Sequence, residues 1–212
     1  MSPRREADAG LVDVSSNAGP ATAIRLSCRL ARTAEERAAY FALRRAIFCA
    51  EQGLFGDDDR DDCDARAHPV ICLAEGGGQD RAAGAGAGGP RVVGVVRLWE
   101  DAPGDWWGGR LGVDPAYRTE GSVGRRLVQT AVGTARAWGA TRFRATVQRA
   151  NVPFFRRLRW RSVEELVLFA QPHHLMQAEL EAYPPTAEPR PDPRTLTSSC
   201  PPSLADETEN AA

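Results

Sequence analysis

Apolar residues alternate with polar ones at the start of the chain's first ordered segment and then recur at helical spacing. Every second position from Ile24 to Leu30 is apolar, which predicts a strand with one buried face. Thr33 and Glu36 have the spacing of a capping box, so a helix is expected to begin there. Gly53 and the acidic run after it are expected to end this helix. Its apolar positions are Ala39, Leu43, Ile47 and Phe48.

The remainder of the chain combines short apolar runs with one long amphipathic segment. The short runs predict strands at 70–74, 92–99, 110–113, 143–147 and 163–169. The amphipathic segment 123–138 predicts a helix that stops at Gly139. Shorter helices are expected around Asn151 and over 172–182. The order β-α-β-β-β-α-β-α-β predicts an α+β (mixed α/β) fold, with helices on both faces of a mixed sheet.

Three segments lack the periodicity of a folded core. Residues 1–22 mix charge, Gly, Ser and Pro, and the stretch 76–90 is mostly Gly and Ala. Residues 184–212 are rich in Pro, Thr, Ser and Glu, a composition that buries too little apolar surface to offset the entropy of ordering. We therefore expect one domain over 23–183 with a flexible loop at 76–90, between a disordered N-terminal segment and a disordered C-terminal tail.

The segment from Leu111 to Leu127 carries the strongest chemical signal. It consists of a short predicted strand, a Pro turn, and a loop with Gly121 and Gly124 that opens into the amphipathic helix. The unpaired N–H groups at a helix start favour an anion, and the glycines allow a phosphate to approach the backbone. Nearby arginines add positive charge. We interpret this segment as a pyrophosphate-binding loop.

Two other phosphate-binding motifs are excluded. Gly124 is followed by Arg-Arg, where a Walker A loop needs Lys and then Ser or Thr. The run from Gly84 to Gly89 has the spacing of a dinucleotide fingerprint, but no apolar strand precedes it and Pro90 follows where a helix should begin. We interpret that run as a linker.

Composition narrows the class of partner. The 27 basic and 28 acidic residues nearly balance, so no whole-chain charge favours nucleic acid. No apolar run approaches the roughly 18–20 residues that cross a bilayer, and the N-terminus lacks the apolar core of a secretory signal. The five cysteines are scattered, and Cys63, His68 and Cys72 match no zinc spacing. We expect a cytoplasmic protein with free thiols, no metal and no membrane or nucleic-acid partner.

Several motifs resemble those of the GNAT superfamily of acetyl-CoA-dependent N-acetyltransferases. The run from Val113 to Gly121 is similar to the family's central motif, an apolar strand, a Pro turn and Arg-x-x-Gly-x-Gly/Ala. Gly124 lies one residue later than the family's last glycine, and Val123 takes its place. The segment 151–160 resembles the family's Asn followed by Phe-Tyr-x-x-Leu-Gly-Phe. The segment 43–52 resembles Arg-x-x-Val-Phe-x-x-Glu-Gln, found in some members.

The resemblance covers about residues 23–183 and implies a mostly antiparallel GNAT-like sheet, with acetyl-CoA as co-substrate. Together with the run Trp107-Gly-Gly-Arg-Leu-Gly-Val, these motifs also resemble a bacterial subfamily, the nitrogen-starvation N-acetyltransferases. In the family the pantetheine arm lies beside the strand at 110–113, and the N–H of Val113 would stabilise charge on the thioester oxygen. The cofactor-binding residues that it implies are Leu111, Gly112, Val113, Arg118, Gly121, Ser122, Val123, Gly124, Arg125, Asn151 and Phe155.

The resemblance also identifies where acid–base chemistry is needed. The family's Tyr, often the acid that protonates the departing thiolate, corresponds to Phe155, which has no proton to donate. Water, another residue or unaided departure of the thiolate would have to serve, since a thiol pKa of about 8.5 makes it a tolerable leaving group. Glu51 and Glu100 are the candidate general bases for the incoming amine.

The acceptor is expected to be an amine, and the acidic run 57–64 would attract a cationic one, although a solvated surface loop explains the run equally well. Trp99, Trp106 and Trp107 could wall an aromatic or alkylammonium pocket or belong to the core. The sequence leaves two questions open: whether the protein forms a homodimer, and whether Cys49 forms a covalent acetyl-enzyme. Two other functions also stay open: a non-catalytic acyl-CoA-binding regulatory or interaction subunit, and an acyltransferase resembling acyl-homoserine-lactone synthases.

Overall fold

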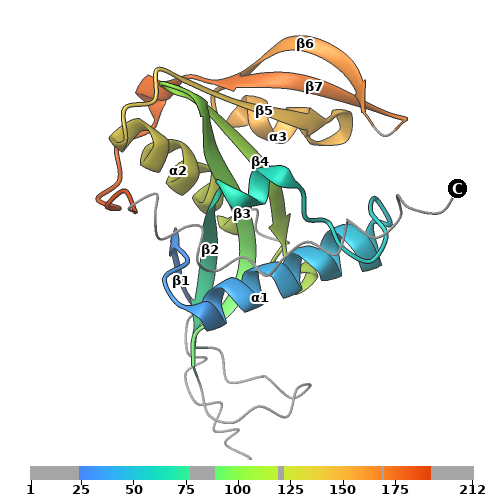
Figure 1. The fold of residues 1–212 in the computed structure, drawn as a ribbon, viewed down its shortest axis with the longest axis vertical. Helices are drawn as coiled ribbons and strands as arrows, with labels where there is room; N and C mark the ends of the chain where they lie inside the picture. Colours follow the sequence, from blue (N-terminus) through green and yellow to red (C-terminus); the bar gives the residue numbers. More distant parts are fainter. Residues whose placement is uncertain (1–23, 77–88, 119–121, 169, 192–212) are drawn as a thin grey trace, which may run out of the picture.

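The computed structural model describes residues 24–76, 89–118, 122–168 and 170–191. In these ranges the strands form one seven-stranded sheet in the order β1-β2-β3-β4-β5-β7-β6 (Figure 1). All neighbouring strands are antiparallel except β4 and β5, which are parallel. The strands are β1 (Arg25–Leu30), β2 (His68–Glu75), β3 (Arg91–Ala102), β4 (Asp105–Val113), β5 (Arg142–Gln148), β6 (Trp160–Leu168) and β7 (Gln171–Ala178). The expected mixed, mostly antiparallel α+β fold is confirmed.

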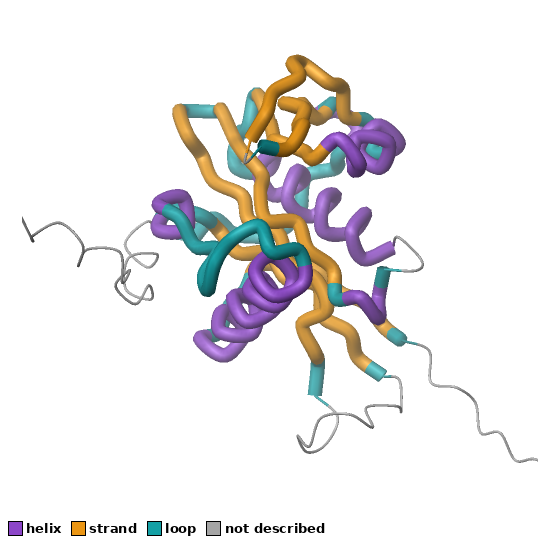
Figure 2. The backbone as a smooth tube through the Cα atoms, turned by 90° about the vertical axis from the view of Figure 1, so that its right-hand side faces the viewer, coloured by secondary structure: helices purple, strands orange, loops and turns teal. Residues whose placement is uncertain are grey.

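Helices cover both faces of the sheet (Figure 2). The α-helices are α1 (Ala34–Arg44), α2 (Ser122–Ala137) and α3 (Val152–Arg157). Helix α1 continues without a break into a π-helical segment, η1 (Arg45–Glu51). The 3-10 turns are η2 (Asp62–Ala65), η3 (Pro115–Tyr117), η4 (Arg149–Asn151) and η5 (Leu180–Ala182). None of the described helices is long and apolar enough to cross a membrane.

Local sequence signals set the ends of the first helix. Thr33 accepts a hydrogen bond from the Glu36 N–H, and the Glu36 side chain accepts one from the Thr33 N–H, which confirms the capping box. Glu36 also forms an ion pair with Arg29 of β1. The helical segment ends at Glu51, shortly before Gly53, whose φ of 60° suits a glycine.

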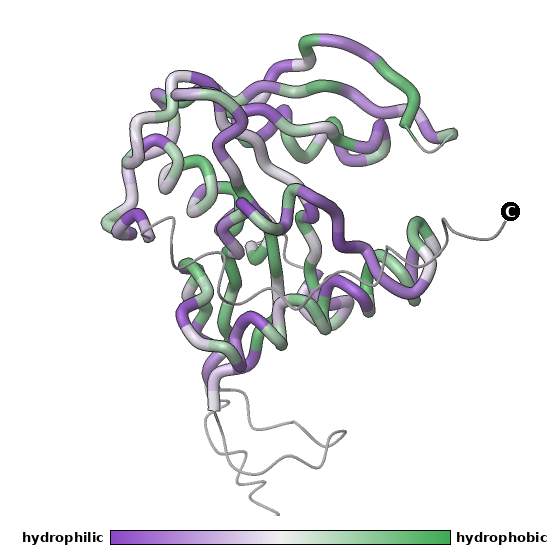
Figure 3. Tube along the Cα trace, viewed as in Figure 1, coloured by the Kyte–Doolittle hydropathy of each residue, from purple (hydrophilic) through white to green (hydrophobic). Residues whose placement is uncertain are grey.

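The main core lies between the sheet and α2. Hydrophobic residues concentrate in the central strands (Figure 3). A Cβ at Gly94 of β3 would lie 2.6 Å from Val123 Cγ1 and 2.8 Å from Leu127 Cδ1, so a glycine is needed for α2 to pack this closely. A smaller cluster on the opposite face joins Tyr40 of α1 to Ile71 and other residues of β2 and β3.

The helix predicted over 172–182 is wrong, because β7 occupies most of that range. Its sequence contains Leu175, Met176, Gln177 and Ala178, which favour a helix locally. The strand instead pairs with β5 on one edge and β6 on the other. Pairing on both edges satisfies the backbone and overrides the local preference.

Part of the expected C-terminal tail packs on the core. The Thr186 N–H donates to the Gly133 carbonyl of α2 at 3.1 Å, and Trp138 Nε1 donates to the Glu188 carbonyl at 2.8 Å. Residues 184–191 therefore have defined contacts. The expected N-terminal segment 1–22, most of the expected loop 76–90 and the rest of the tail lie outside the described residues.

His68 makes the stability of the fold depend on pH. Its ring packs against Trp138 with centroids 4.8 Å apart, and burial, followed by the nearby Arg190, lowers the pKa of His68 from 6.5 to about 4. The unfolded chain therefore gains a proton at pH values where the folded protein does not. Stability from this residue is fully present above the unfolded pKa and is lost as the pH falls toward the folded one. We expect a loss of about 2 kcal/mol between pH 7 and pH 5.

Urea unfolding at these two pH values tests this expectation, with His68→Gln as the comparison. The range lies above the usual carboxylate pKa values, so the acidic residues contribute little to the change. The variant should show a much smaller loss than the wild type. Equal losses in the two proteins would show that His68 is not the source.

Candidate active site

A bulge in β4 separates this strand from β5. Val95 pairs with Gly112 and Arg97 pairs with Gly109, so β4 contains one residue more than β3 across this interval. Arg110 in the bulge has a φ of 54°, which is rare for a residue with a side chain. The bend directs the second half of β4 away from its parallel neighbour.

The ladder between β4 and β5 ends where this bend begins. The paired residues run only from Asp105–Arg142 to Gly108–Ala145, although β4 continues to Val113 and β5 to Gln148. Beyond Gly108 the two strands present unpaired backbone groups to each other across an opening. Figure 1 shows β5, β6 and β7 bending away from the other strands. Two facing free edges are suited to an extended ligand that carries amide groups.

A cavity of about 680 Å³ occupies this opening. On the α1 side its walls include Phe48, Leu54 and Phe55. On the α3 side they include Asn151 and Phe155. The cavity therefore passes between the strands from one face of the sheet to the other, which leaves room for a linear ligand and a second molecule.

The second half of β4, which was predicted to bind the cofactor, lies along the cavity. Leu111, Gly112 and Val113 all line it. The Asp114 N–H donates to the Val93 carbonyl of β3 at 2.9 Å, and the peptide groups of successive strand residues point to opposite edges. The Val113 N–H therefore points toward β5 and is available to a ligand.

The glycine in this run has a packing reason as well. A Cβ at Gly112 would lie 2.9 Å from Ile47 Cδ1 and 3.5 Å from the Phe48 ring. The glycine thus lets η1 cross close over β4. Its predicted contribution to ligand binding comes through the backbone only.

The predicted phosphate-binding residues around the start of α2 do not all face the cavity. Gly121 lies outside the described residues, and Ser122 begins the helix. Val123 is 1% exposed in the main core, so only its backbone can meet a ligand. Gly124 lines the cavity, and a Cβ there would lie 3.3 Å from the Phe154 ring, so this glycine lets α3 approach α2. Arg125 instead lines a smaller cavity of about 160 Å³.

Arg118 and Glu51 form a pair rather than acting separately. Both guanidinium Nη atoms bind the Glu51 carboxylate at 2.6 and 2.7 Å, and Arg118 Nε donates to the Val113 carbonyl at 2.7 Å. This contact joins the end of η1 to the end of β4 at the rim of the cavity. Arg118 keeps its position at the cavity, whereas Glu51 does not line it.

Asn151 and Phe155, two of the predicted cofactor-binding residues, both line the cavity. Asn151 precedes α3 but makes no side-chain capping bond, so its amide remains available to a ligand. Phe155 is 7% exposed and packs edge-on against Trp160 with ring centroids 5.1 Å apart. Phe155 contributes an apolar wall and no proton.

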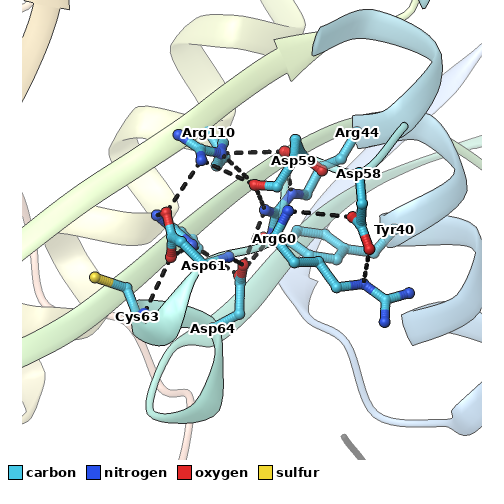
Figure 4. Close-up of polar contacts among 10 residues, drawn as sticks. Tyr40, Arg44, Asp58, Asp59, Arg60, Asp61, Cys63, Asp64 and Arg110 are labelled. Atoms are coloured by element: carbon cyan, nitrogen blue, oxygen red, sulfur yellow. Dashed lines mark hydrogen bonds and ion pairs between the residues drawn. The ribbon is translucent and has the colours of Figure 1, made fainter. Parts of the chain in front are cut away.

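The acidic loop is held on the protein by arginines (Figure 4). Arg44 at the end of α1 is fully buried. Its Nε donates to Asp59 Oδ2 at 2.8 Å, and its two Nη atoms donate to the Asp64 carboxylate at 2.5 and 3.0 Å. The Tyr40 hydroxyl accepts a further bond from Arg44 at 3.2 Å. The loop therefore places two carboxylates around one interior guanidinium.

Two strand arginines complete this network. Arg97 of β3 binds Asp61 through both Nη atoms at 2.6 Å and contacts Asp64 at 2.9 Å. Arg110 of the β4 bulge donates to the Asp59 carbonyl at 2.8 Å and to Asp61 at 3.0 Å. We call the six residues Arg44, Asp59, Asp61, Asp64, Arg97 and Arg110 the ion-pair network. Its three carboxylates are all paired with arginines, so none of these three is free to bind a cationic acceptor, one of the two roles that the sequence left open for the run 57–64.

The three tryptophans divide between the two faces. Trp99 and Trp107 stack on each other and line the cavity, with centroids 6.4 Å apart and an interplanar angle of 15°. Trp106 is fully buried on the opposite face, 5.6 Å from the ring of Trp138 at the end of α2. Two of the three thus wall the site and one belongs to the core.

Comparison with known proteins identifies this architecture. The sequence profile of the acetyltransferase (GNAT) family matches residues 39–159. This chain belongs to the GNAT acetyltransferase family. A search of curated protein sequences found no significant match.

Solved structures share the GNAT fold. A protein described provisionally as an N-acetyltransferase, from Lactobacillus plantarum, has a TM-score of 0.60 and 22% identity, over 73% of this chain and 98% of that one. An acyl-CoA N-acyltransferase from Pseudomonas aeruginosa has a TM-score of 0.52 and 21% identity, over 74% and 99%. Escherichia coli ElaA has a TM-score of 0.53 and 20% identity, over 74% and 100%. At these identities the likeness establishes the fold.

Membership of the GNAT family makes the protein an acyltransferase, and the fold supports acyl transfer from acyl-CoA to an amine. The finer likeness to nitrogen-starvation N-acetyltransferases is not resolved by these comparisons. Among the described residues of this GNAT protein, no three His, Cys, Asp or Glu side chains are grouped so as to hold a metal ion.

The two carboxylates predicted as general bases do not line the cavity of this GNAT protein. The hydrogen bonds from Arg118 lower the pKa of Glu51, which makes it a weaker base. Glu100 accepts from the Gly104 N–H at 2.8 Å and pairs with Arg190, and these contacts lower its pKa as well. Both carboxylates are engaged elsewhere, so the geometry does not favour either as the base.

His173 is a candidate base that the sequence analysis missed. It lies in β7 opposite Gln148, lines the cavity and is 9% exposed. Its Nδ1 lies 2.9 Å from the Gln171 carbonyl, which can only accept, so Nδ1 carries the proton in the neutral ring. Nε2 is then the unprotonated nitrogen, and it has no hydrogen-bond partner within the described ranges. The sequence predicted a helix over 172–182, and only the pairing of β7 with β5 places His173 at the cavity.

Proposed function

We propose that the protein transfers an acetyl group from acetyl-CoA to the primary amine of a small molecule or peptide, by direct attack in a ternary complex. The observation that carries this proposal is the opening between β4 and β5. Its facing strand edges offer free amide groups to the pantetheine arm, and the Val113 N–H points into it. The apolar walls exclude water from a reactive thioester.

The reaction needs no covalent acetyl-enzyme. The neutral amine nitrogen attacks the thioester carbonyl carbon, which forms the C–N bond and places negative charge on the carbonyl oxygen. The Val113 N–H stabilises that charge. Collapse of the intermediate breaks the C–S bond and releases CoA thiolate. The proton lost from nitrogen passes to the base and the thiolate takes up a proton from solvent.

His173 is the base that we propose, in place of Glu51 and Glu100. Its buried position at the cavity and its unprotonated Nε2 suit it to accept a proton from the amine. Phe155 cannot supply a proton to the thiolate. Because a thiol pKa of about 8.5 allows the thiolate to leave near neutral pH, the reaction does not require an acid at that position.

Calorimetric titration with acetyl-CoA tests the cofactor site. Replacing Asn151 by alanine is expected to weaken binding by about 3- to 10-fold, because the variant loses one hydrogen bond to the cofactor. Arg149→Ala is the matched control, since Arg149 lies two residues away in the same 3-10 turn, is exposed and does not line the cavity. Unchanged affinity in the Asn151 variant would remove that residue from the site.

Thiol release with added amines separates the two classes of function. Release of CoA on addition of an amine supports the transferase. Tight binding of acetyl-CoA with no release for any amine would favour a non-catalytic acyl-CoA-binding subunit, for which Phe155 is the specific argument. Absence of acetyl-CoA binding would refute both.

A further inference from the structure

Four side chains stack in a row across β3, β4 and β5 on the α1 side of the sheet. The Arg97 guanidinium lies 5.1 Å from the Trp99 ring centroid, and Trp99 stacks on Trp107. The Arg144 guanidinium lies 4.4 Å from the Trp107 centroid and covers its other side. We call Arg97, Trp99, Trp107 and Arg144 the cation–aromatic stack. Its first three members line the cavity.

This stack contains N–H donors that lack acceptors. Among the described residues, five buried side-chain nitrogens have no hydrogen-bond partner, and three of them are Arg97 Nε, Trp107 Nε1 and Arg144 Nε. The side chain of Arg97 is only 4% exposed. A buried donor without an acceptor costs free energy, and two of these three belong to residues that line the cavity, Arg97 and Trp107, which indicates that oxygen atoms of a ligand complete the site.

Gly109 leaves space for such an oxygen beside the stack. It lies opposite Arg97 in the ladder and lines the cavity. A Cβ built on Gly109 would lie 3.5 Å from Arg97 Nε and 3.4 Å from Trp99 Cζ3. The missing side chain therefore leaves the side of Gly109 next to the unpartnered Nε and the Trp99 ring uncovered, so that a ligand can approach there.

The cavity is lined by arginines and not by the carboxylates that balance their charge, an arrangement that can seat an anionic group. The ionisable side chains that line it are Arg97, Arg110, Arg118, Tyr117 and His173, and no carboxylate of the described residues does so. The acidic side chains that contact these arginines are Glu51 and those of the ion-pair network, and all of them are already paired. A polyamine would find no free carboxylate for its second cationic group.

From these contacts we infer that the amine acceptor is an α-amino acid with a large apolar or aromatic side chain. Its carboxylate accepts hydrogen bonds from the Arg97 and Trp107 N–H groups above Gly109, and its side chain packs among Phe48, Leu54 and Phe55. The amine nitrogen attacks the thioester as described above, so the product is an N-acyl amino acid and free CoA. The inference rests on the proposed function.

Paired acceptors that differ only in the carboxylate test this inference. Acetyl-CoA binding is measured first by calorimetry, and CoA release is then compared for phenylalanine, phenethylamine and spermidine. We expect kcat/KM for phenylalanine to exceed that for phenethylamine by about 10- to 100-fold, the size of a charge-assisted hydrogen bond. Phenylalaninamide, which keeps the carbonyl but not the charge, should fall between them.

Variants then assign the preference to the stack. Trp107→Phe keeps an aromatic ring and removes the N–H, and it should lower the ratio of kcat/KM for phenylalanine to that for phenethylamine by about tenfold. Gly109→Ala should have the same effect, because the added methyl group would fill part of the space through which the carboxylate approaches Arg97 Nε. Trp106→Phe is the matched control, because it removes an unpartnered N–H on the opposite face and should leave the preference unchanged.

The outcomes separate this inference from the proposed function. If acetyl-CoA does not bind, the proposed function fails and the inference with it. If acetyl-CoA binds and CoA is released equally well with phenethylamine, or best with spermidine, the function stands and the amino-acid acceptor is refuted. A preference for phenylalanine that survives Trp107→Phe and Gly109→Ala would also refute the assigned carboxylate site.

Discussion

Replacing Arg44 by methionine is expected to lower the free energy of unfolding by about 3–5 kcal/mol. Methionine is close in length to the arginine stem and leaves no large cavity. The loss arises because Asp59 and Asp64 stay buried, with side chains 1% and 5% exposed, after their central partner is gone. Urea unfolding at pH 7 measures the change.

Arg66→Met is the matched control for this experiment. Arg66 forms an ion pair with Asp101, but the two side chains are 50% and 47% exposed. Exposed pairs of this kind contribute about 0–1 kcal/mol. If the two variants lost the same stability, the ion-pair network would not be what holds the acidic loop on the sheet.

Replacing His173 by glutamine is expected to lower kcat by about 100- to 10,000-fold, the usual contribution of a general base. Glutamine is similar in size, can donate to the Gln171 carbonyl and cannot accept a proton. Acetyl-CoA affinity should stay unchanged, because the substitution removes proton transfer rather than a cofactor contact. The dependence of the remaining rate on pH should lose the limb that reports the base.

His174→Gln provides the control for His173. His174 follows directly in β7, so its side chain points to the other face of the strand, where Nδ1 lies 3.1 Å from Ser162 Oγ. The control should keep nearly full activity. A His173→Gln variant as active as the control would show that another group, or water, removes the proton.

Local signals in the sequence were enough to predict much of the fold. The capping box at Thr33, the amphipathic stripe of α2 and the alternating or apolar strands depend on residues close together in the chain. The loop between β4 and α2 could be recognised for the same reason. These features follow from helix and strand periodicity, which operates over a few residues.

Features that depend on distant residues could not be predicted. The strand β7 has helix-favouring residues and becomes a strand only because β5 and β6 pair with it. The ion-pair network joins residues from α1, the acidic loop, β3 and β4, and no local spacing relates them. His173 lies on β7, so its place at the cavity could not be predicted without knowing that β7 pairs with β5 and β6. Glu51 was predicted as a base because its ion pair with Arg118, which is 67 residues away in the sequence, could not be foreseen.

The use of arginine in the ion-pair network also affects whether the proposed co-substrate, acetyl-CoA, could acetylate the protein itself. The 212-residue sequence contains no lysine, so every cationic side chain in the network is a guanidinium. Lysine amines are readily acetylated and lose their charge, whereas guanidinium groups stay protonated at all ordinary pH values. In the proposed acetyl-CoA complex, the activated thioester would therefore have no side-chain amine of the enzyme to modify. The charges that hold the acidic loop in place would be chemically inert during every catalytic cycle.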